Sequence, residues 1–369
     1  MTIGVAILGS TGSIGRATLE VLARHRDRFR VVALTAGSNA DLLSVQAAAW
    51  TPAYTGLAKN GQGGAACLVE AATHPDVRVV VNGVVGAAGL DATLAALRAG
   101  KRVALANKEP LVMAGELVTQ AARQGGGEIV PVDSEHSAVL QCLGERGPAT
   151  VTRLILTASG GPFRDWTPDR TAAATVAEAL NHPTWKMGRK ITVDSATLVN
   201  KALEVIEAHF LFGMAYPQVE VVVHPQSVIH AFVEFVDGSV LAQVSFPTME
   251  LPILYALTHP ERLPDSGTRR FDPVAAQALT FEPVRPDRFP AYALGRAAGL
   301  AGGTAPAVFN GANEEAVQLF LDGRVPFGAI APAIAAALEG HRPTPAVSLD
   351  EVLAADAEGR RLAREAACS

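Results

Sequence analysis

The sequence predicts an α/β fold that opens with a doubly wound parallel sheet. A strand, a glycine-rich turn and a helix begin the chain, and alternating strand and helix patterns continue to about residue 132. A largely antiparallel α+β domain is expected next, and four helical patterns close the chain as a small bundle. A chain of 369 residues is long enough for two or three such domains.

Composition narrows the class of protein. The formal net charge of -5 argues against nucleic-acid binding, and no apolar run is long enough for a membrane helix. The amino end has no basic segment of the kind that opens a signal peptide. The three scattered cysteines, Cys67, Cys142 and Cys368, exclude a disulfide framework and a thiolate zinc site, and they favour a reducing cytoplasm.

The first domain carries a dinucleotide-binding pattern. Residues 5–8 are an apolar strand, residues 9–15 read GSTGSIG, and a helical pattern covers 17–23. Glycines in such a turn let a pyrophosphate approach the backbone at the helix N-terminus. Further strands of a parallel sheet are expected at 31–34, 77–81, 102–105 and 129–132.

The turn after the second strand, Gly37-Ser38-Asn39, bears on the choice of cofactor. NAD enzymes usually place an acidic residue there to hold the ribose hydroxyls. Here Asp41 is only close by, and the small polar side chains leave room for a 2′-phosphate. NADP(H) is therefore favoured over NAD, although the turn contains no Arg or Lys.

Two polar clusters follow strands of the same sheet. Residues 107–109 (NKE) and 133–135 (DSE) lie at the carboxyl edge, where ligands bind in such folds. A polar loop that starts a helix accounts poorly for Lys108. Asp133 and Glu135 offer hard oxygen ligands suited to Mg²⁺ or Mn²⁺, and a helix cap with solvated charge is the alternative.

The segment 181–207, NHPTWKMGRKITVDSATLVNKALEVIE, carries the most functional groups. Its second part predicts a helix capped by Asp194, Ser195 or Thr197 and ended by Gly213. One face of that helix is apolar, and the other presents amide, ammonium and carboxylate groups from Asn200, Lys201, Glu204 and Glu207.

The part before this helix is expected to be a lid. His182, Trp185 and Met187 lie in a loop between Pro183 and Gly188. Apolar side chains are costly to leave in water unless the loop closes over a ligand.

The remaining patterns complete the second domain. Strands are expected at 153–156, 219–223, 229–236 and 240–246, with a hairpin at Asp237-Gly238. Ser159 lies in a tight glycine turn and either donates to a phosphate or is a plain turn residue. His224 and His230 are interpreted as structural rather than catalytic.

The carboxyl-terminal third is expected to have a packing role. Residues 258–290 are rich in Pro, Asp and Arg and predict an extended linker. Helical patterns cover 291–301, 307–321, 329–338 and 349–366. Asn310, Asn313 and Glu314 are polar positions that face either a cleft or the solvent.

The motifs GSTGSIG, NKE, PVDSEHSA, TASGGPF, the 181–207 segment and HPQSVIH follow one another along the chain. Over nearly the whole length this order closely resembles the 1-deoxy-D-xylulose 5-phosphate reductoisomerase family. The resemblance implies an NADPH-binding domain at 1–133, a connective catalytic domain at 134–259 with a lid near 181–189, a linker at 260–290 and a four-helix bundle at 291–369. It also implies a cytoplasmic homodimer.

The resemblance further implies the reaction and the residues that perform it. The reaction is the metal-dependent isomerisation and NADPH reduction of 1-deoxy-D-xylulose 5-phosphate to 2-C-methyl-D-erythritol 4-phosphate, in isoprenoid precursor biosynthesis. By this resemblance the ligands of one divalent cation, Mg²⁺, Mn²⁺ or Co²⁺, are Asp133, Glu135 and Glu204. The implied substrate contacts are Lys108, Ser134, Glu135, Ser159, His182, Trp185, Ser195, Asn200, Lys201 and Glu204, of which Lys108 and His182 join the metal ligands as catalytic candidates. The implied cofactor contacts are Thr11, Gly12, Ser13, Ile14, Gly37, Ser38, Asn39, Asn107, Glu109 and Gly188.

Two alternatives stay open at this point. A semialdehyde-type NADP-dependent dehydrogenase also begins with such a glycine turn, but it needs a nucleophilic cysteine at a helix N-terminus. A non-catalytic NADP-binding sensor on the same fold is expected to lack some of the acids or the lysine. A chelator that left activity intact would favour the first, and cofactor binding without turnover would favour the second.

Overall fold

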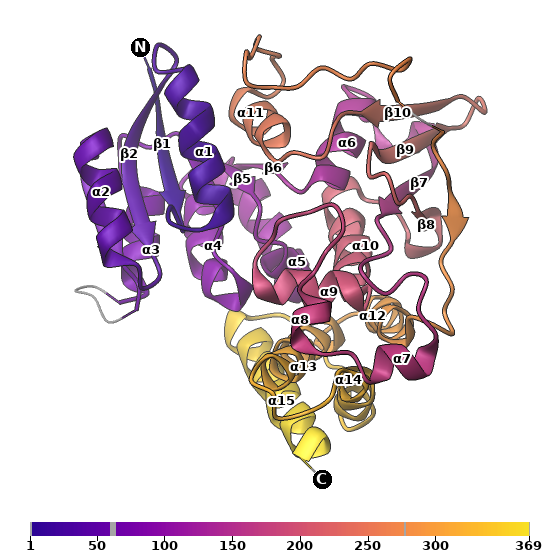
Figure 1. The fold of residues 1–369 in the computed structure, drawn as a ribbon. Coiled ribbons are helices and arrows are strands. Elements are labelled where there is room, and N and C mark those ends of the chain that lie inside the picture. Colours follow the sequence, from indigo (N-terminus) through magenta and orange to yellow (C-terminus); the bar gives the residue numbers. More distant parts are fainter. Residues whose placement is uncertain (1, 60–63, 277, 369) are drawn as a thin grey trace. The chain divides into compact units, whose positions relative to one another are not determined.

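The computed structural model describes residues 2–59, 64–276 and 278–368 (Figure 1). The chain forms two compact units. The first contains Met1–Pro110, Leu117–Gly144 and Thr248–Arg270, and the second contains Leu111–Glu116, Glu145–Pro247 and Phe271–Ser369. The four-part division expected from the sequence stays a prediction, and residue 277 of its linker lies outside the described residues.

The first unit holds a six-stranded sheet in the order β3-β2-β1-β4-β5-β6, and the predicted parallel pairing is confirmed. The order reverses between β1 and β4, which is the switch point where such sheets bind dinucleotides. The sequence prediction lacked the short edge strand β3, which contains a glycine. The strands are β1 Ile3–Leu8, β2 Phe29–Ala36, β3 Tyr54–Leu57, β4 Val79–Asn82, β5 Arg102–Leu105 and β6 Glu128–Pro131.

Helices follow the strands of this sheet. The strands are apolar along their length because helices cover the sheet, so that Val5, Ile7 and Val81 are all buried. The helical elements of the first unit are α1 Ser13–Arg24, α2 Ala40–Trp50, α3 Ala66–Thr73, η1 Gly86–Gly89, α4 Leu90–Arg98, α6 Ser134–Leu143 and α11 Glu250–Thr258, and α5 Glu109–Gly125 contributes both its ends.

The distant segment 248–270 belongs to the first unit through two kinds of contact. Ile253 and Leu257 of α11 are buried in the same apolar cluster as the strands. Arg24 of α1 donates to Asp265 at 2.7 Å and to Glu250 at 2.5 Å. The side chain of Asp265 is almost fully buried, so this ion pair lies inside the first unit and holds segment 248–270 against α1.

The second unit contains a mixed five-stranded sheet in the order β10-β9-β7-β8-β11. Only β7 and β8 are parallel, so the prediction of a largely antiparallel sheet is confirmed. The predicted hairpin joins β9 to β10, and Gly238 adopts the positive φ of 83° that such turns need. The strands are β7 Val151–Ala158, β8 Val219–Val223, β9 Ile229–Phe235, β10 Val240–Val244 and β11 Glu282–Pro283.

The four carboxyl-terminal helices are confirmed, and they gather at the yellow and orange end of the second unit in Figure 1. They are α12 Pro290–Ala301, α13 Ala305–Leu321, α14 Ile330–Glu339 and α15 Leu349–Cys368. The helical elements that precede them in this unit are η2 Pro148–Thr150, α7 Pro168–Ala172, α8 Val176–Ala179, α9 Arg189–Ala196, α10 Val199–Phe212 and η3 Tyr216–Gln218, and η4 Phe327–Ala329 precedes α14.

The start of the central helix differs from the prediction. Asp194 and Ser195 are not N-caps, because they lie inside the separate helix α9, and Thr197 ends that helix. Leu198 takes a left-handed conformation with φ 57° and breaks the chain direction before α10. The predicted end is correct, since Gly213 terminates α10 with φ 66°.

The polar face of α10 is not presented to water as the sequence pattern indicated. Lys201, Glu204 and Glu207 are buried, with at most 3% of each residue exposed. Buried charges need partners, so this face is held by ionic contacts rather than by solvation.

None of the helices in the described ranges combines the length and the apolar character that crossing a membrane requires.

Candidate functional site

The turn between β1 and α1 is built for a close approach of backbone to ligand. Gly9 has φ 82°, and the amide of Gly12 donates to its carbonyl at 3.0 Å. A Cβ on Gly15 would lie 2.4 Å from the Gly9 oxygen, so only glycine fits there. The four residues predicted to contact the pyrophosphate, Thr11, Gly12, Ser13 and Ile14, therefore lie between two glycines that fix the turn.

The predicted ribose turn follows β2. Gly37, Ser38 and Asn39 are all exposed at the carboxyl edge of the sheet. The Asn39 side chain caps α2 by accepting from the amide of Leu42 at 3.1 Å. Ser38 is thus the polar side chain of this turn that no helix cap engages.

Asn107 and Glu109 meet at the carboxyl end of β5. Asn107 is buried, and its amide nitrogen donates to Glu109 at 2.6 Å and to the carbonyl of Gly86 at 3.1 Å. The two predicted cofactor residues therefore stiffen each other, in the same unit as the glycine turn.

Lys108 and Asp133 form a salt bridge at the ends of β5 and β6. Lys108 is buried, and a buried ammonium is retained only with an anionic partner. Asp133 occupies the N-cap position of α6, yet its side chain makes no capping hydrogen bond. The helix-cap interpretation of Asp133 is therefore wrong, and its carboxylate is directed to Lys108.

Ser134 and Glu135 follow in the first turn of α6. The Ser134 hydroxyl, which is nearly buried, donates to the Glu135 carboxylate at 2.5 Å. The four predicted residues of the first unit thus form two pairs, Lys108 with Asp133 and Ser134 with Glu135.

In the second unit, two glycines follow Ser159 and bring the turn after β7 against α9. Gly160 and Gly161 have φ 84° and 67°, so the chain turns sharply after β7. A Cβ on Gly161 would lie 2.6 Å from the carbonyl oxygen of Ser195 in α9. The absence of a side chain at residue 161 is what allows the turn that carries Ser159 to pack against the backbone of Ser195.

The lid was predicted near residues 181–189; residues 181–188 have no regular structure, and Arg189 begins α9. His182 Nε2 lies 3.0 Å from Ser159 Oγ, and the Trp185 ring lies 6.3 Å from the ring of His230 in β9. Both lid side chains are partly buried. Burial lowers the pKa of His182 from its ordinary value to about 4, so the imidazole is neutral near pH 7.

Three further predicted residues meet on α10. Glu204 is fully buried and accepts from Asn200 Nδ2 at 2.6 Å and from Lys201 Nζ at 2.5 Å. A buried carboxylate with an amide and an ammonium around it is stable as an anion. Gly188, the remaining predicted cofactor residue, is exposed at the N-cap of α9.

Asp194, which the sequence pattern indicated as a helix cap, lies inside α9 just before the predicted site residue Ser195. Asn313 of α13 donates to it at 2.9 Å, and Lys190 pairs with its other oxygen at 2.9 Å. Asp194 and Asn313 are both buried, so Asn313 faces neither solvent nor an open cleft. The polar pattern of 310–314 was the only sequence signal for this contact.

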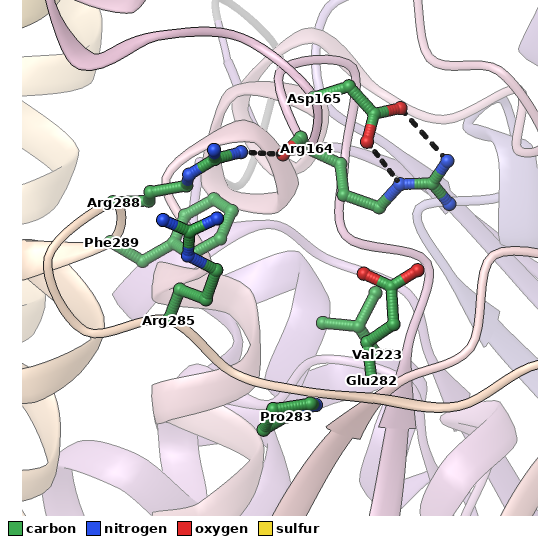
Figure 2. A pocket seen from close by; sticks show the side chains of 8 residues that line it. All are labelled: Arg164, Asp165, Val223, Glu282, Pro283, Arg285, Arg288 and Phe289. Carbon is green, nitrogen blue, oxygen red and sulfur yellow. Dashed lines mark hydrogen bonds and ion pairs between the residues drawn. The ribbon is translucent and has the colours of Figure 1, made fainter.

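A surface pocket of about 190 Å³ lies apart from these residues (Figure 2). In Figure 2, Arg164 pairs with Asp165, and Arg288 donates to the carbonyl of Arg164 at 2.6 Å. None of the predicted site residues lines it. The hydrogen bond from Arg288 to Arg164 instead joins the chain near residue 288 to the segment after β7.

The two buried cysteines give no nucleophile to the semialdehyde alternative. Cys67 and Cys142 are buried, and burial raises the pKa of Cys142 to about 11. Burial likewise raises the pKa of Cys67. Both remain thiols at neutral pH, and a thiolate is the reactive form.

A parallel sheet of this strand order with a glycine turn at its switch point is typical of dinucleotide-binding oxidoreductases. A family model described as 1-deoxy-D-xylulose 5-phosphate reductoisomerase matches residues 5–62 and 56–115, and models of the C-terminal domains of this enzyme match 129–212 and 244–362. The chain belongs to the 1-deoxy-D-xylulose 5-phosphate reductoisomerase family.

Individual relatives agree. The chain is 50% identical to a 1-deoxy-D-xylulose 5-phosphate reductoisomerase of Citrifermentans bemidjiense, with 98% of each chain covered. It is similar to a reductoisomerase crystal structure in complex with NADPH, fosmidomycin and magnesium, with TM-score 0.93, 39% identity and 99% and 98% coverage. The reductoisomerase of Zymomonas mobilis in complex with NADPH gives TM-score 0.90, 40% identity and 99% coverage of both chains.

Proposed function

We propose that this chain performs its family's reaction through the residues described above. It isomerises 1-deoxy-D-xylulose 5-phosphate and reduces the product with NADPH to 2-C-methyl-D-erythritol 4-phosphate, for isoprenoid precursor biosynthesis. The observation that carries this proposal is the Lys108–Asp133 pair. It places a buried ammonium, and a carboxylate that does not cap helix α6, at the carboxyl edge of a dinucleotide-binding sheet.

The divalent cation is held by Asp133, Glu135 and Glu204. Carboxylate oxygens suit Mg²⁺, Mn²⁺ or Co²⁺. Asp133 makes no helix-capping hydrogen bond, and Glu204 is fully buried. When bound, the cation supplies Lewis-acid stabilisation of negative charge on the substrate oxygens. Lys108 and Ser134 hold the first two carboxylates in place and contact the substrate beside them.

The phosphate of the substrate binds to residues of the second unit. Ser159 and Ser195 supply hydroxyl donors, and Lys201 with Asn200 supplies an ammonium and an amide. His182 orients Ser159 and contacts the substrate, and Trp185 covers the reacting carbons from water.

The cofactor binds along the carboxyl edge of the six-stranded sheet. Its pyrophosphate contacts residues 11–14, and its ribose phosphate contacts residues 37–39. Asn107 and Glu109, which hold each other, and Gly188, which opens α9, complete the contacts.

The enzyme acts as a cytoplasmic homodimer. The support for a dimer is the edge strand β10, where Val240 is 49% and Leu241 42% exposed, with Val236 beside it 68% exposed. An apolar strand at a sheet edge is a template for pairing with a second copy unless it is covered.

An assay of NADPH oxidation with 1-deoxy-D-xylulose 5-phosphate, with and without EDTA, tests the proposal. Turnover that EDTA abolishes and Mg²⁺ or Mn²⁺ restores is the expected result. Turnover that resists the chelator would favour a dehydrogenase without a metal. Tight NADPH binding with no turnover in any metal would favour a non-catalytic sensor.

A further inference from the structure

The carboxyl ends of β2 and β3 bring one lysine to the ribose turn. The two strands are parallel, with Ala36 opposite Leu57. The pairing continues past the strands, because the amide of Ala58 donates to Ala36 at 2.9 Å and that of Lys59 donates to the carbonyl of Gly37 at 2.7 Å. The backbone of Lys59 is therefore fixed beside the first residue of the turn.

The ribose turn lacks the charge needed to recognise a 2′-phosphate. Dinucleotide folds usually read the 2′ position just after the second strand, with an acid for a hydroxyl or an arginine for a phosphate. Here Ser38 is uncharged, Asn39 is engaged as the cap of α2, and the nearby Asp41 is an exposed acid that opposes a phosphate. Selection for NADPH must therefore come from a cation outside the turn.

Lys59 meets this requirement. Within residues 36–41 and 54–59 it is the single basic residue, and its side chain is exposed rather than committed to the core. A lysine is a flexible point charge that binds phosphate without fixed fork geometry. Lys59 follows the edge strand β3, about twenty residues along the chain from Ser38, so the local sequence of the turn does not indicate it.

We propose that Lys59 binds the 2′-phosphate of NADPH and sets the preference of this chain for NADPH over NADH. The inference rests on the proposed function and adds a specificity residue to it. Arg16 is the alternative cation for the 2′-phosphate. It directly follows the glycine turn, is exposed in the first turn of α1, and its amide donates to the Gly12 carbonyl at 3.0 Å.

Binding measurements without substrate test the assignment. Dissociation constants for NADPH and NADH, and for the fragments 2′,5′-ADP and AMP, are measured by calorimetry on the full chain and its variants. Lys59→Ala is expected to weaken NADPH and 2′,5′-ADP by about tenfold or more, as for loss of a charged hydrogen bond, and to leave NADH and AMP nearly unchanged. Lys59→Arg is expected to restore most of the NADPH affinity.

A matched control removes one positive charge at the far end of the neighbouring strand β2. Arg30 is the second residue of β2 and pairs with Asp76 at 3.1 Å, so Arg30→Ala is expected to leave all four affinities unchanged. Added salt should weaken NADPH more than NADH in the wild type, and this difference should shrink in Lys59→Ala.

Three results would overturn the assignment. They are equal losses of NADPH and NADH affinity in Lys59→Ala, a selective loss in Arg16→Ala with none in Lys59→Ala, and a wild type that binds both cofactors equally. Failure of the proposed function looks different, because NADPH would then bind selectively while 1-deoxy-D-xylulose 5-phosphate is not turned over.

Discussion

His182 Nε2 lies 3.0 Å from Ser159 Oγ, and His182 is the hydrogen-bond donor in this contact. His182 Nδ1 accepts from the amides of Thr184 at 3.1 Å and Trp185 at 2.9 Å, so the proton of the neutral ring is on Nε2. Ser159 Oγ then accepts from His182 and from the amide of Gly161 at 3.2 Å. Its own hydroxyl proton remains to be donated, which suits a phosphate oxygen.

The stability of the protein should fall in weak acid because of His182. Its pKa is about 4 when folded, below the ordinary 6.5, so between these values the unfolded chain binds more protons. The stabilisation is complete above about pH 6.5 and is lost as the pH falls toward 4. Denaturant unfolding at several pH values should show a smaller loss over this window for His182→Gln than for the wild type. Parallel pH profiles would contradict the assignment of a neutral His182.

Removing the indole of Trp185 should slow turnover. Trp185 lies in a segment without regular structure and packs near His230, so Trp185→Ala uncovers whatever the loop closes upon. We expect turnover to fall by about tenfold or more, with an unchanged dissociation constant for NADPH. Trp185→Phe keeps an apolar ring and should recover part of the rate. Steady-state kinetics that leave both turnover and KM unchanged in Trp185→Ala would remove the loop from the mechanism.

Glu204→Gln should separate metal binding from cofactor binding. The change removes a buried negative charge that Asn200 and Lys201 contact, and a carboxamide is a poor ligand for a hard cation. Activity should fall by about a hundredfold or more while the NADPH dissociation constant stays the same. Mg²⁺ should raise the melting temperature of the wild type but not of this variant. A fully active variant with a normal Mg²⁺ response would exclude Glu204 as a ligand.

Asn313→Ala should weaken substrate binding through Asp194. The substitution leaves a buried carboxylate with one partner fewer, which costs about 1–3 kcal/mol of stability. Because Ser195 follows Asp194 in α9, the KM for the substrate should rise while NADPH affinity is unchanged.

Asn310→Ala is the matched control for this prediction. Asn310 is equally buried in α13 but donates to Asp356 at 3.1 Å, away from α9. It should lose similar stability without a change in KM. An equal rise in KM in both variants would show that the effect of residue 313 is general destabilisation.

The clusters of the site were visible in the sequence, but their pairings were not. Residues 107–109 and 133–135 could be placed at one sheet edge because each follows a strand. That Lys108 pairs with Asp133, or that Ser159 meets His182, depends on side chains packed from separate segments. The same holds for Asp194, whose partner Asn313 comes from a helix far along the chain.

The sequence by itself determined the strand, glycine turn and helix at the amino end, the hairpin at Gly238, the end of α10 at Gly213 and the four closing helices. These features follow from local rules, because side-chain periodicity and the positive φ of glycine act over a few residues. Tertiary structure alone decided the break at Leu198, the burial of Glu204 and the pairing of the edge strand that precedes Lys59. Those depend on contacts between distant segments, whose energies no local pattern contains.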